Sequence, residues 1–220
     1  MDKNKFLEQL LENKEMYVLL DTNFFIPPHN INIKDFDTYW VDKLLSLFKG
    51  FMIHESVKNE MIGTRLSAYA NKLTVCYNSD LSPEEACRYK FIHSVIVNQL
   101  NVGLSKKGKN VGEAETLSYM YAKRFPTVIS RDTDIIDNIC SGSVGVLMNG
   151  ECGVIHFYEL LYVLRKLNAV DNKILKAFFK AFYPTGVGDG QNKVRIAFSE
   201  LVHELDMVYG EDYVKVMKLV

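Results

Sequence analysis

The strongest constraint on the fold is a short apolar segment that runs directly into three polar residues. Residues 17–20 read Tyr-Val-Leu-Leu, and Asp21, Thr22 and Asn23 follow at once. An apolar run without polar alternation indicates a strand buried on both faces, as in a parallel sheet covered by helices. A carboxylate there is costly unless it accepts hydrogen bonds or binds a cation. Ligands bind at the carboxyl ends of parallel strands, so Asp21 is a candidate for chemistry; its simpler role would be to cap the next turn.

A second apolar segment shows the same pattern. Residues 127–130 read Thr-Val-Ile-Ser and lead into Arg131, Asp132 and Asp134. If the two strands are neighbours in a parallel sheet, about 5 Å apart, Asp21 and Asp132 lie within reach of one cation. Asp134 is a further candidate ligand or, alternatively, a cap for the helix that follows. Arg131 either steers a phosphate or neutralises the neighbouring carboxylates.

Apolar strands alternate with amphipathic helices along most of the chain. Further strands are expected at residues 51–53 and 73–77, and helices at residues 3–14, 37–48, 55–73, 83–100, 112–124 and 135–139. This alternation indicates an α/β fold with a mainly parallel central sheet. Two or three more helices are expected after residue 148. The sequence therefore predicts a domain at residues 1–150, N-terminal helix included, and a C-terminal helical extension at residues 151–220 packed on the same domain.

Three further acids lie on predicted helices. Glu113 occupies the first turn of the helix before the second strand, and a right-handed β-α-β connection brings that turn to the sheet edge of Asp21. Glu115 lies two residues later, so on a helix it points to a different side. Glu60 lies on the helix after residues 51–53, where an isolated acid is also explained as solvated surface charge.

The candidate ligands are all carboxylates, and this ligand type indicates which metal ions the site would bind. Hard oxygen ligands without clustered His or Cys suit Mg²⁺ or Mn²⁺ and not zinc. Several like charges held together are destabilising unless a cation compensates them. The four cysteines form no C-x-x-C pair, a pattern typical of reduced thiols in a cytoplasmic protein.

In order and approximate spacing, these motifs resemble those of the PIN-domain family. The resemblance spans residues 16–148 and rests on the segments Leu20-Asp21-Thr22-Asn23, Glu60, Gly112-Glu113-Ala114-Glu115 and Ile129-Ser130-Arg131-Asp132-Thr133-Asp134. It implies a Rossmann-like α/β/α sandwich. It also implies a Mg²⁺- or Mn²⁺-dependent endoribonuclease that hydrolyses RNA with a metal-activated water, as in toxin–antitoxin toxins and ribosomal-RNA processing factors.

The resemblance assigns a role to each acid. Asp21, Glu113 and Asp132 would be catalytic metal ligands, and Asp134 the second acid of the fourth motif. Glu60 would be either a ligand or a base outside the ligand set.

Asn23 would orient Asp21. The family commonly has one acid at the third motif, which corresponds here to Gly112-Glu113-Ala114-Glu115. Glu113 is chosen as the metal ligand because Gly112-Glu113 matches the motif and because Glu113 lies nearer the start of the helix. Glu115 stays a supporting residue.

A basic loop precedes the helix that carries Glu113. Lys106, Lys107 and Lys109 are candidate phosphate contacts in this loop, or they are solvated surface charge. The formal net charge of −1 offers no general attraction for nucleic acid, so RNA would be held by local patches or through a metal.

The expected setting is cytoplasmic. The N-terminal residues lack the apolar core of a signal peptide, and no apolar run reaches membrane-spanning length. RNA is the expected substrate, and an antitoxin protein or a second copy of the chain is a candidate partner; no membrane is expected.

Other functions fit the motifs less well. A topoisomerase-primase-like acid set would use Glu113, Asp132 and Asp134 but leaves Asp21 unexplained. An aspartyl phosphatase needs a second Asp at the position of Asn23. The non-enzymatic alternative is a catalytically weak PIN-like module that binds RNA or a protein.

Overall fold

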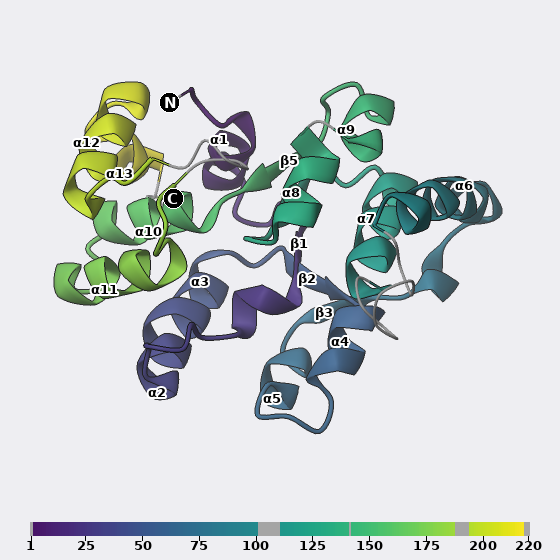
Figure 1. The fold of residues 1–220 in the computed structure, drawn as a ribbon, viewed down its shortest axis with the longest axis horizontal. Coiled ribbons are helices and arrows are strands. Elements are labelled where there is room, and N and C mark those ends of the chain that lie inside the picture. The colour runs from purple at the N-terminus through teal and green to yellow at the C-terminus, as the bar shows by residue number, and fades with distance from the viewer. Residues whose placement is uncertain (1, 101–110, 141, 188–193, 218–220) are drawn as a thin grey trace. The chain divides into compact units, whose positions relative to one another are not determined.

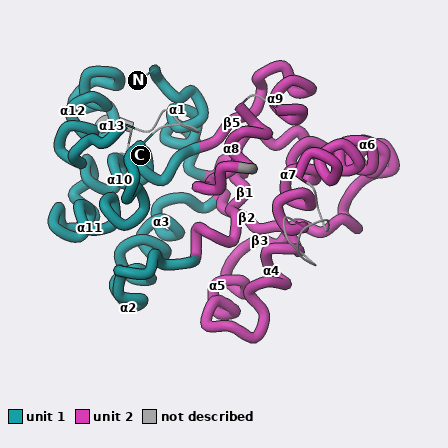
Figure 2. The backbone as a smooth tube through the Cα atoms, in the orientation of Figure 1, with its two compact units in different colours: residues 1–14, 26–49, 155–220 teal, residues 15–25, 50–154 magenta. Residues whose placement is uncertain are grey.

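The computed structural model describes residues 2–100, 111–140, 142–187 and 194–217, and the side chains of Asp134, Val216 and Met217 lie outside this description. The chain divides into two compact units (Figure 2). Unit 1 contains residues 1–14, 26–49 and 155–220, and unit 2 contains residues 15–25 and 50–154.

Unit 2 is built on a five-stranded parallel sheet flanked by helices (Figure 1). Its strands are β1 Val18–Leu20, β2 Phe51–His54, β3 Thr74–Cys76, β4 Thr127–Ile129 and β5 Gly153–Ile155, in the order β3-β2-β1-β4-β5. The central strand β1 pairs with β2 through Leu19 and Met52, and with β4 through Leu20 and Ile129. This sheet confirms the predicted α/β class and the predicted adjacency of the two strands that run into Asp.

Helices and short turns connect the strands of unit 2. They are η1 Thr22–Phe25, α4 Glu55–Met61, α5 Ser67–Ala70, η3 Asn78–Asp80, α6 Pro83–Gln99, α7 Val111–Lys123, α8 Thr133–Cys140 and α9 Ser143–Leu147. The strands contribute Leu19, Met52 and Val128 to a core that also contains Leu117 and Met120 of α7. Burial of these apolar side chains holds the strand ends and the start of α7 in fixed positions.

The prediction of a single helix at residues 55–73 was wrong, because this segment forms two helices, α4 and α5. Gly63 has a φ of 76°, and this left-handed conformation ends helices. The freed carbonyl of Met61 accepts hydrogen bonds from the backbone N and Oγ1 of Thr64, at 3.2 and 2.7 Å. The apolar spacing continues past this break because Leu66 and Tyr69 return to the core, so periodicity alone does not reveal it.

The strand β5 is a second difference from the expectation. Its three residues lie between Cys152 and His156 and are too few to establish a pattern. The backbone N of Gly153 donates to the carbonyl of Pro126 at 2.8 Å. This contact sets β5 beside β4 at the edge of the sheet.

Unit 1 is helical. Its elements are α1 Lys5–Glu12, α2 Ile33–Phe36, the π-helical turn η2 Asp37–Val41, α3 Asp42–Leu47, α10 Phe157–Lys166, α11 Asn172–Phe182, α12 Phe198–Tyr209 and α13 Tyr213–Met217. The helix expected at residues 37–48 therefore begins four residues earlier, after the cap Asn32, and includes a π turn. Phe36, Trp40, Phe157 and Phe182 pack as one aromatic cluster, with ring centroids 4.9–6.3 Å apart.

The predicted boundary at residue 150 lies close to the passage from unit 2 to unit 1, between Val154 and Ile155. Unit 1 also contains residues 1–14 and 26–49, so the N-terminal helix groups with the C-terminal helices and not with the sheet. The packing of residues 151–220 onto the domain predicted at residues 1–150 stays a prediction. None of the helices in the described parts of the chain has the length and apolar character to cross a membrane.

The contacts of Asn4 explain why α1 belongs to unit 1. The side chain of Asn4 caps α1 by accepting from the backbone N of Phe6, and its Nδ2 donates to Oε2 of Glu159 at 2.9 Å. The backbone N of Asn4 donates to the hydroxyl of Tyr209 at 2.8 Å. Glu159 is buried, and burial raises its pKa to about 7, against hydrogen bonds from His156 and Asn4 that lower it.

Replacing Asn4 with Ala should lower the free energy of unfolding by about 1–3 kcal/mol, because a helix cap and a donor to a buried carboxylate are lost together. Urea unfolding at pH 8, where Glu159 is largely ionised, measures the change. Asn32→Ala is the matched control: exposed Asn32 caps α2 from Lys34 N at 2.9 Å, and its loss should cost about 1 kcal/mol or less. Equal losses in the two variants would contradict a special role for Asn4.

Candidate functional site

Asp21 lies at the carboxyl end of the central strand β1. Its backbone N donates to the carbonyl of Ile129 at 3.2 Å, which continues the pairing of β1 with β4. Only 7% of the residue is exposed. Its Oδ1 accepts from the backbone N of Thr22 at 2.6 Å, and its Oδ2 accepts from the hydroxyl of Ser130 at 2.9 Å and from Nδ2 of Asn23. The carboxylate is therefore held in one orientation by three donors.

Asn23 connects the turns that follow β1 and β4. Besides its bond to Asp21, its Nδ2 lies 3.2 Å from the hydroxyl of Ser130, and its Oδ1 accepts from the backbone N of Arg131 at 3.4 Å. The contact of Asn23 with Asp21 is thus present, and the predicted role of Asn23, to orient Asp21, stays a prediction.

Ser130 is a residue to which the sequence analysis gave no role. It is fully buried, and its hydroxyl donates to Asp21 while accepting from the backbone N of Asp132 at 2.9 Å. One hydroxyl thus joins the two acidic turns. A small hydroxyl residue between a buried strand and an acid is the signal that could have identified it, because a hydroxyl there can donate to a neighbouring buried carboxylate and lower the cost of its burial.

Glu113 and Asp132 share the electrostatic environment of Asp21. Burial, together with the charges of Glu113 and Asp132, raises the pKa of Asp21 to about 7, although hydrogen bonds from Ser130 and Thr22 act in the opposite direction. Both neighbours are half-buried. Glu113 at the start of α7 and Asp132 in the turn after β4 therefore both lie near enough to Asp21 to repel its carboxylate.

Glu60 approaches this site through Thr22. The hydroxyl of Thr22 donates to Oε2 of Glu60, although Glu60 itself is exposed. Its carboxylate also lies against Gly112 in the first turn of α7, where a Cβ would collide with it. Gly112 thus leaves room for Glu60 beside the residue that precedes Glu113.

Glu115 faces a different cluster from Glu113. Its carboxylate accepts from the hydroxyl of Tyr89 and from Nδ2 of Asn78 at 3.1 Å, and it lies 3.6 Å from Nε2 of His93. Two of these partners belong to α6, so Glu115 joins α6 to α7. The two acids point to different sides of the helix, as residues two apart should.

Several predicted residues have no described side-chain position or only a partial one. Lys106, Lys107 and Lys109 lie outside the described residues, as does the side chain of Asp134. Arg131 is half-buried beside Asp132. Among the described side chains, no group of three or more His, Cys, Asp or Glu is arranged closely enough, as it stands, to hold one metal ion.

Comparisons of the chain with protein-family models, with curated proteins and with solved structures found no match. The resemblance to PIN domains therefore rests on the acidic motifs of this chain.

The raised pKa of Asp21 predicts a pH-dependent stability. An acid with a higher pKa in the folded state binds its proton more tightly there, so folding is favoured at low pH and the advantage disappears as pH rises to the folded pKa. The rise from 3.8 to about 7 corresponds to at most about 4 kcal/mol. In EDTA, the free energy of unfolding should fall between about pH 4 and pH 7, as measured by urea unfolding.

Glu159 also makes the free energy of unfolding fall as pH rises, because burial raises the pKa of its carboxyl from 4.5 to about 7. Asp21→Asn and Glu159→Gln should therefore each flatten the pH dependence in part, which separates the two contributions. A profile for Asp21→Asn that runs parallel to the wild-type profile would contradict the assignment for Asp21.

Proposed function

We propose that the protein is a divalent-metal-dependent endoribonuclease whose site lies at the carboxyl edge of the sheet in unit 2. The observation that supports this most directly is the buried carboxylate of Asp21, whose pKa is raised to about 7 by burial and by Glu113 and Asp132. Strongly perturbed carboxylates with like-charged neighbours are typical of functional sites, because a fold has no structural use for such repulsion.

The residues present fit Mg²⁺ or Mn²⁺. Asp21, Glu113 and Asp132 offer carboxylate oxygens, which these hard cations prefer. A cation would also relieve the repulsion that raises the pKa of Asp21. Glu113 and Asp132 are half-buried, so part of each residue is accessible to a cation from solvent.

The chain's own residues would prepare the site for catalysis. Ser130, Asn23 and the backbone of Thr22 hold the carboxylate of Asp21 in place, which limits the reorganisation needed when the substrate binds. The hydroxyl of Thr22 holds Glu60 beside the start of α7, where Glu60 could accept a proton. A bound ion would lower the pKa of a water molecule and stabilise charge on the phosphate oxygens.

RNA is the proposed substrate because of the resemblance of the four acidic motifs to those of PIN domains. The carboxylates of Asp21, Glu113 and Asp132 agree with phosphodiester hydrolysis by a metal-activated water, a reaction in which no side chain has to act as the nucleophile. Asp134, in the fourth motif, is proposed as an additional ligand.

Single changes Asp21→Asn, Glu113→Gln and Asp132→Asn should each lower the rate of RNA cleavage by about a hundredfold or more, because each removes charge that holds the ion. Glu115→Gln is the matched control on the same helix; it keeps an acceptor for Tyr89 and Asn78 and should change the rate little. Gel analysis of labelled single-stranded and structured RNA with Mn²⁺ measures the rates. Intact RNA with the wild-type protein would instead favour a binding module.

Metal binding should release protons in a pH-dependent way. With a pKa near 7, Asp21 is mostly protonated at pH 6.5, and a bound cation would expel roughly three quarters of a proton. At pH 8.5 the release should be close to zero. Calorimetric titration with Mn²⁺ in two buffers of different ionisation enthalpy measures it, and the release should disappear in Asp21→Asn. The same release in that variant would assign the titrating group elsewhere.

A further inference from the structure

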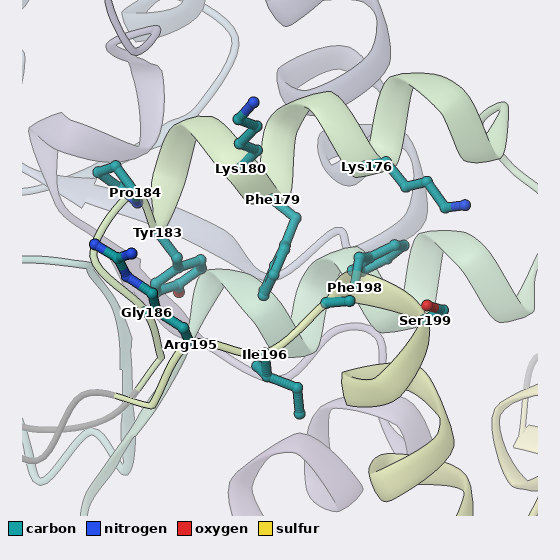
Figure 3. Close-up of a pocket in the computed structure, with 11 residues that line it drawn as sticks. Lys176, Phe179, Lys180, Tyr183, Pro184, Gly186, Arg195, Ile196, Phe198 and Ser199 are labelled. Carbon is teal, nitrogen blue, oxygen red and sulfur yellow. The ribbon is translucent and has the colours of Figure 1, made fainter.

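A pocket in unit 1 lies between the C-terminal half of α11 and the start of α12 (Figure 3). Its volume is about 420 Å³, within the range of small-ligand sites. The described residues that line it are Lys176, Phe179, Lys180, Tyr183, Pro184, Gly186, Arg195, Ile196, Ala197, Phe198 and Ser199. The proposed cleavage site in unit 2 uses none of them.

Aromatic side chains form one side of the pocket. The ring centroid of Phe179 lies 5.3 Å from that of Phe198 and 5.5 Å from that of Tyr183, with interplanar angles of 39° and 40°. The hydroxyl of Tyr183 accepts from the backbone N of Tyr158 at 3.1 Å, which fixes the ring. The aromatic surface is therefore formed before any ligand binds.

Three cations surround this aromatic surface. Lys176, Lys180 and Arg195 are exposed, and none of them pairs with a described residue. Two other lysines of the same unit form ion pairs: Lys166 lies 2.8 Å from Asp206 and Lys215 lies 2.8 Å from Asp212. The described residues that line the pocket include no carboxylate, so the pocket attracts anions.

The arrangement of the cations indicates more than one anionic group. Lys176 and Lys180 lie one turn apart on α11, and Figure 3 shows Lys176 and Arg195 at opposite ends of the pocket. A single small anion requires cations that converge on one point. Cations spread along an aromatic surface instead suit a chain with phosphates on both sides of a planar group.

An adjoining hollow has a different character. It shares Arg195, Ile196 and Ser199 with the pocket but is also lined by Glu200 and Glu204. These carboxylates make it less favourable for phosphate. The charge distribution therefore favours the aromatic pocket as the place where an anionic chain would be held.

We propose that this pocket binds a nucleotide of a single-stranded nucleic acid, with the base against the aromatic side chains and the flanking phosphates on Lys176, Lys180 and Arg195. Every base offers a π face, so binding through stacking and phosphate contacts is tolerant of sequence. The proposal goes beyond the cleavage reaction and does not depend on it, because no acid of unit 2 takes part.

The test is the affinity of the full-length protein for labelled ten-nucleotide oligo(U) RNA and oligo(dT) DNA, measured by fluorescence anisotropy in EDTA. EDTA prevents metal-dependent cleavage, so the result is independent of the proposed function. The triple variant Lys176→Ala, Lys180→Ala and Arg195→Ala should weaken binding about tenfold or more. The slope of log affinity against log salt should fall by about 2, since three phosphate contacts on a single strand are lost.

The charge-matched control is Lys34→Ala, Lys49→Ala and Lys173→Ala, three exposed lysines of unit 1 that do not line the pocket. It should bind as the wild type does. Tyr183→Leu keeps an apolar side chain but removes a half-buried ring of the pocket, and should weaken binding about fivefold or more through lost stacking. Thermal unfolding establishes that each variant is folded.

Three results would overturn the proposal. The first is equal affinity of the cation variant and its control. The second is duplex RNA bound as tightly as single strands, since paired bases cannot stack on the pocket. The third is UMP bound as tightly as oligo(U), which would make a free nucleotide the ligand.

Discussion

The hydrogen bond from Ser130 to Asp21 is the contact on which the candidate site depends. Asp21 ends the central strand and is almost fully buried, so its carboxylate is costly without donors. Ser130 supplies one donor and, through the same hydroxyl, accepts from the backbone N of Asp132. Because β1 and β4 are hydrogen-bonded neighbours, this single side chain fixes the distance between two acidic turns, and the site forms only if the sheet forms.

The same arrangement is destabilising without a counterion. Glu113 and Asp132 raise the pKa of Asp21 in addition to the effect of burial, so the folded state holds its acids together against repulsion. Apolar packing of α7 against the sheet, through Leu117 and Met120, supplies the energy that keeps the start of the helix there. Strain of this kind is usual where function and stability compete.

Unit 1 uses a different kind of core. Two separate stretches of chain contribute rings to its aromatic cluster, and the contacts of Asn4 with Glu159 and Tyr209 bring in the N-terminal helix as a third stretch. One surface of this unit combines aromatic side chains with three cations that pair with none of the residues whose structure is described. Basic and aromatic residues thus gather in a local patch although the whole chain has a formal net charge of −1.

The sequence alone determined the parallel α/β class, the neighbouring strands β1 and β4, and the acids at their ends, because buried strands leave an unbroken apolar run and a charge after it is conspicuous. Only the tertiary structure revealed the role of Ser130, the separate cluster of Glu115, the break at Gly63, the strand β5 and the pocket beside α11. A hydroxyl, a single glycine and a three-residue strand leave no periodic pattern. The pocket joins α11 to residues 195–199, and such contacts between distant segments exist only once the chain has packed.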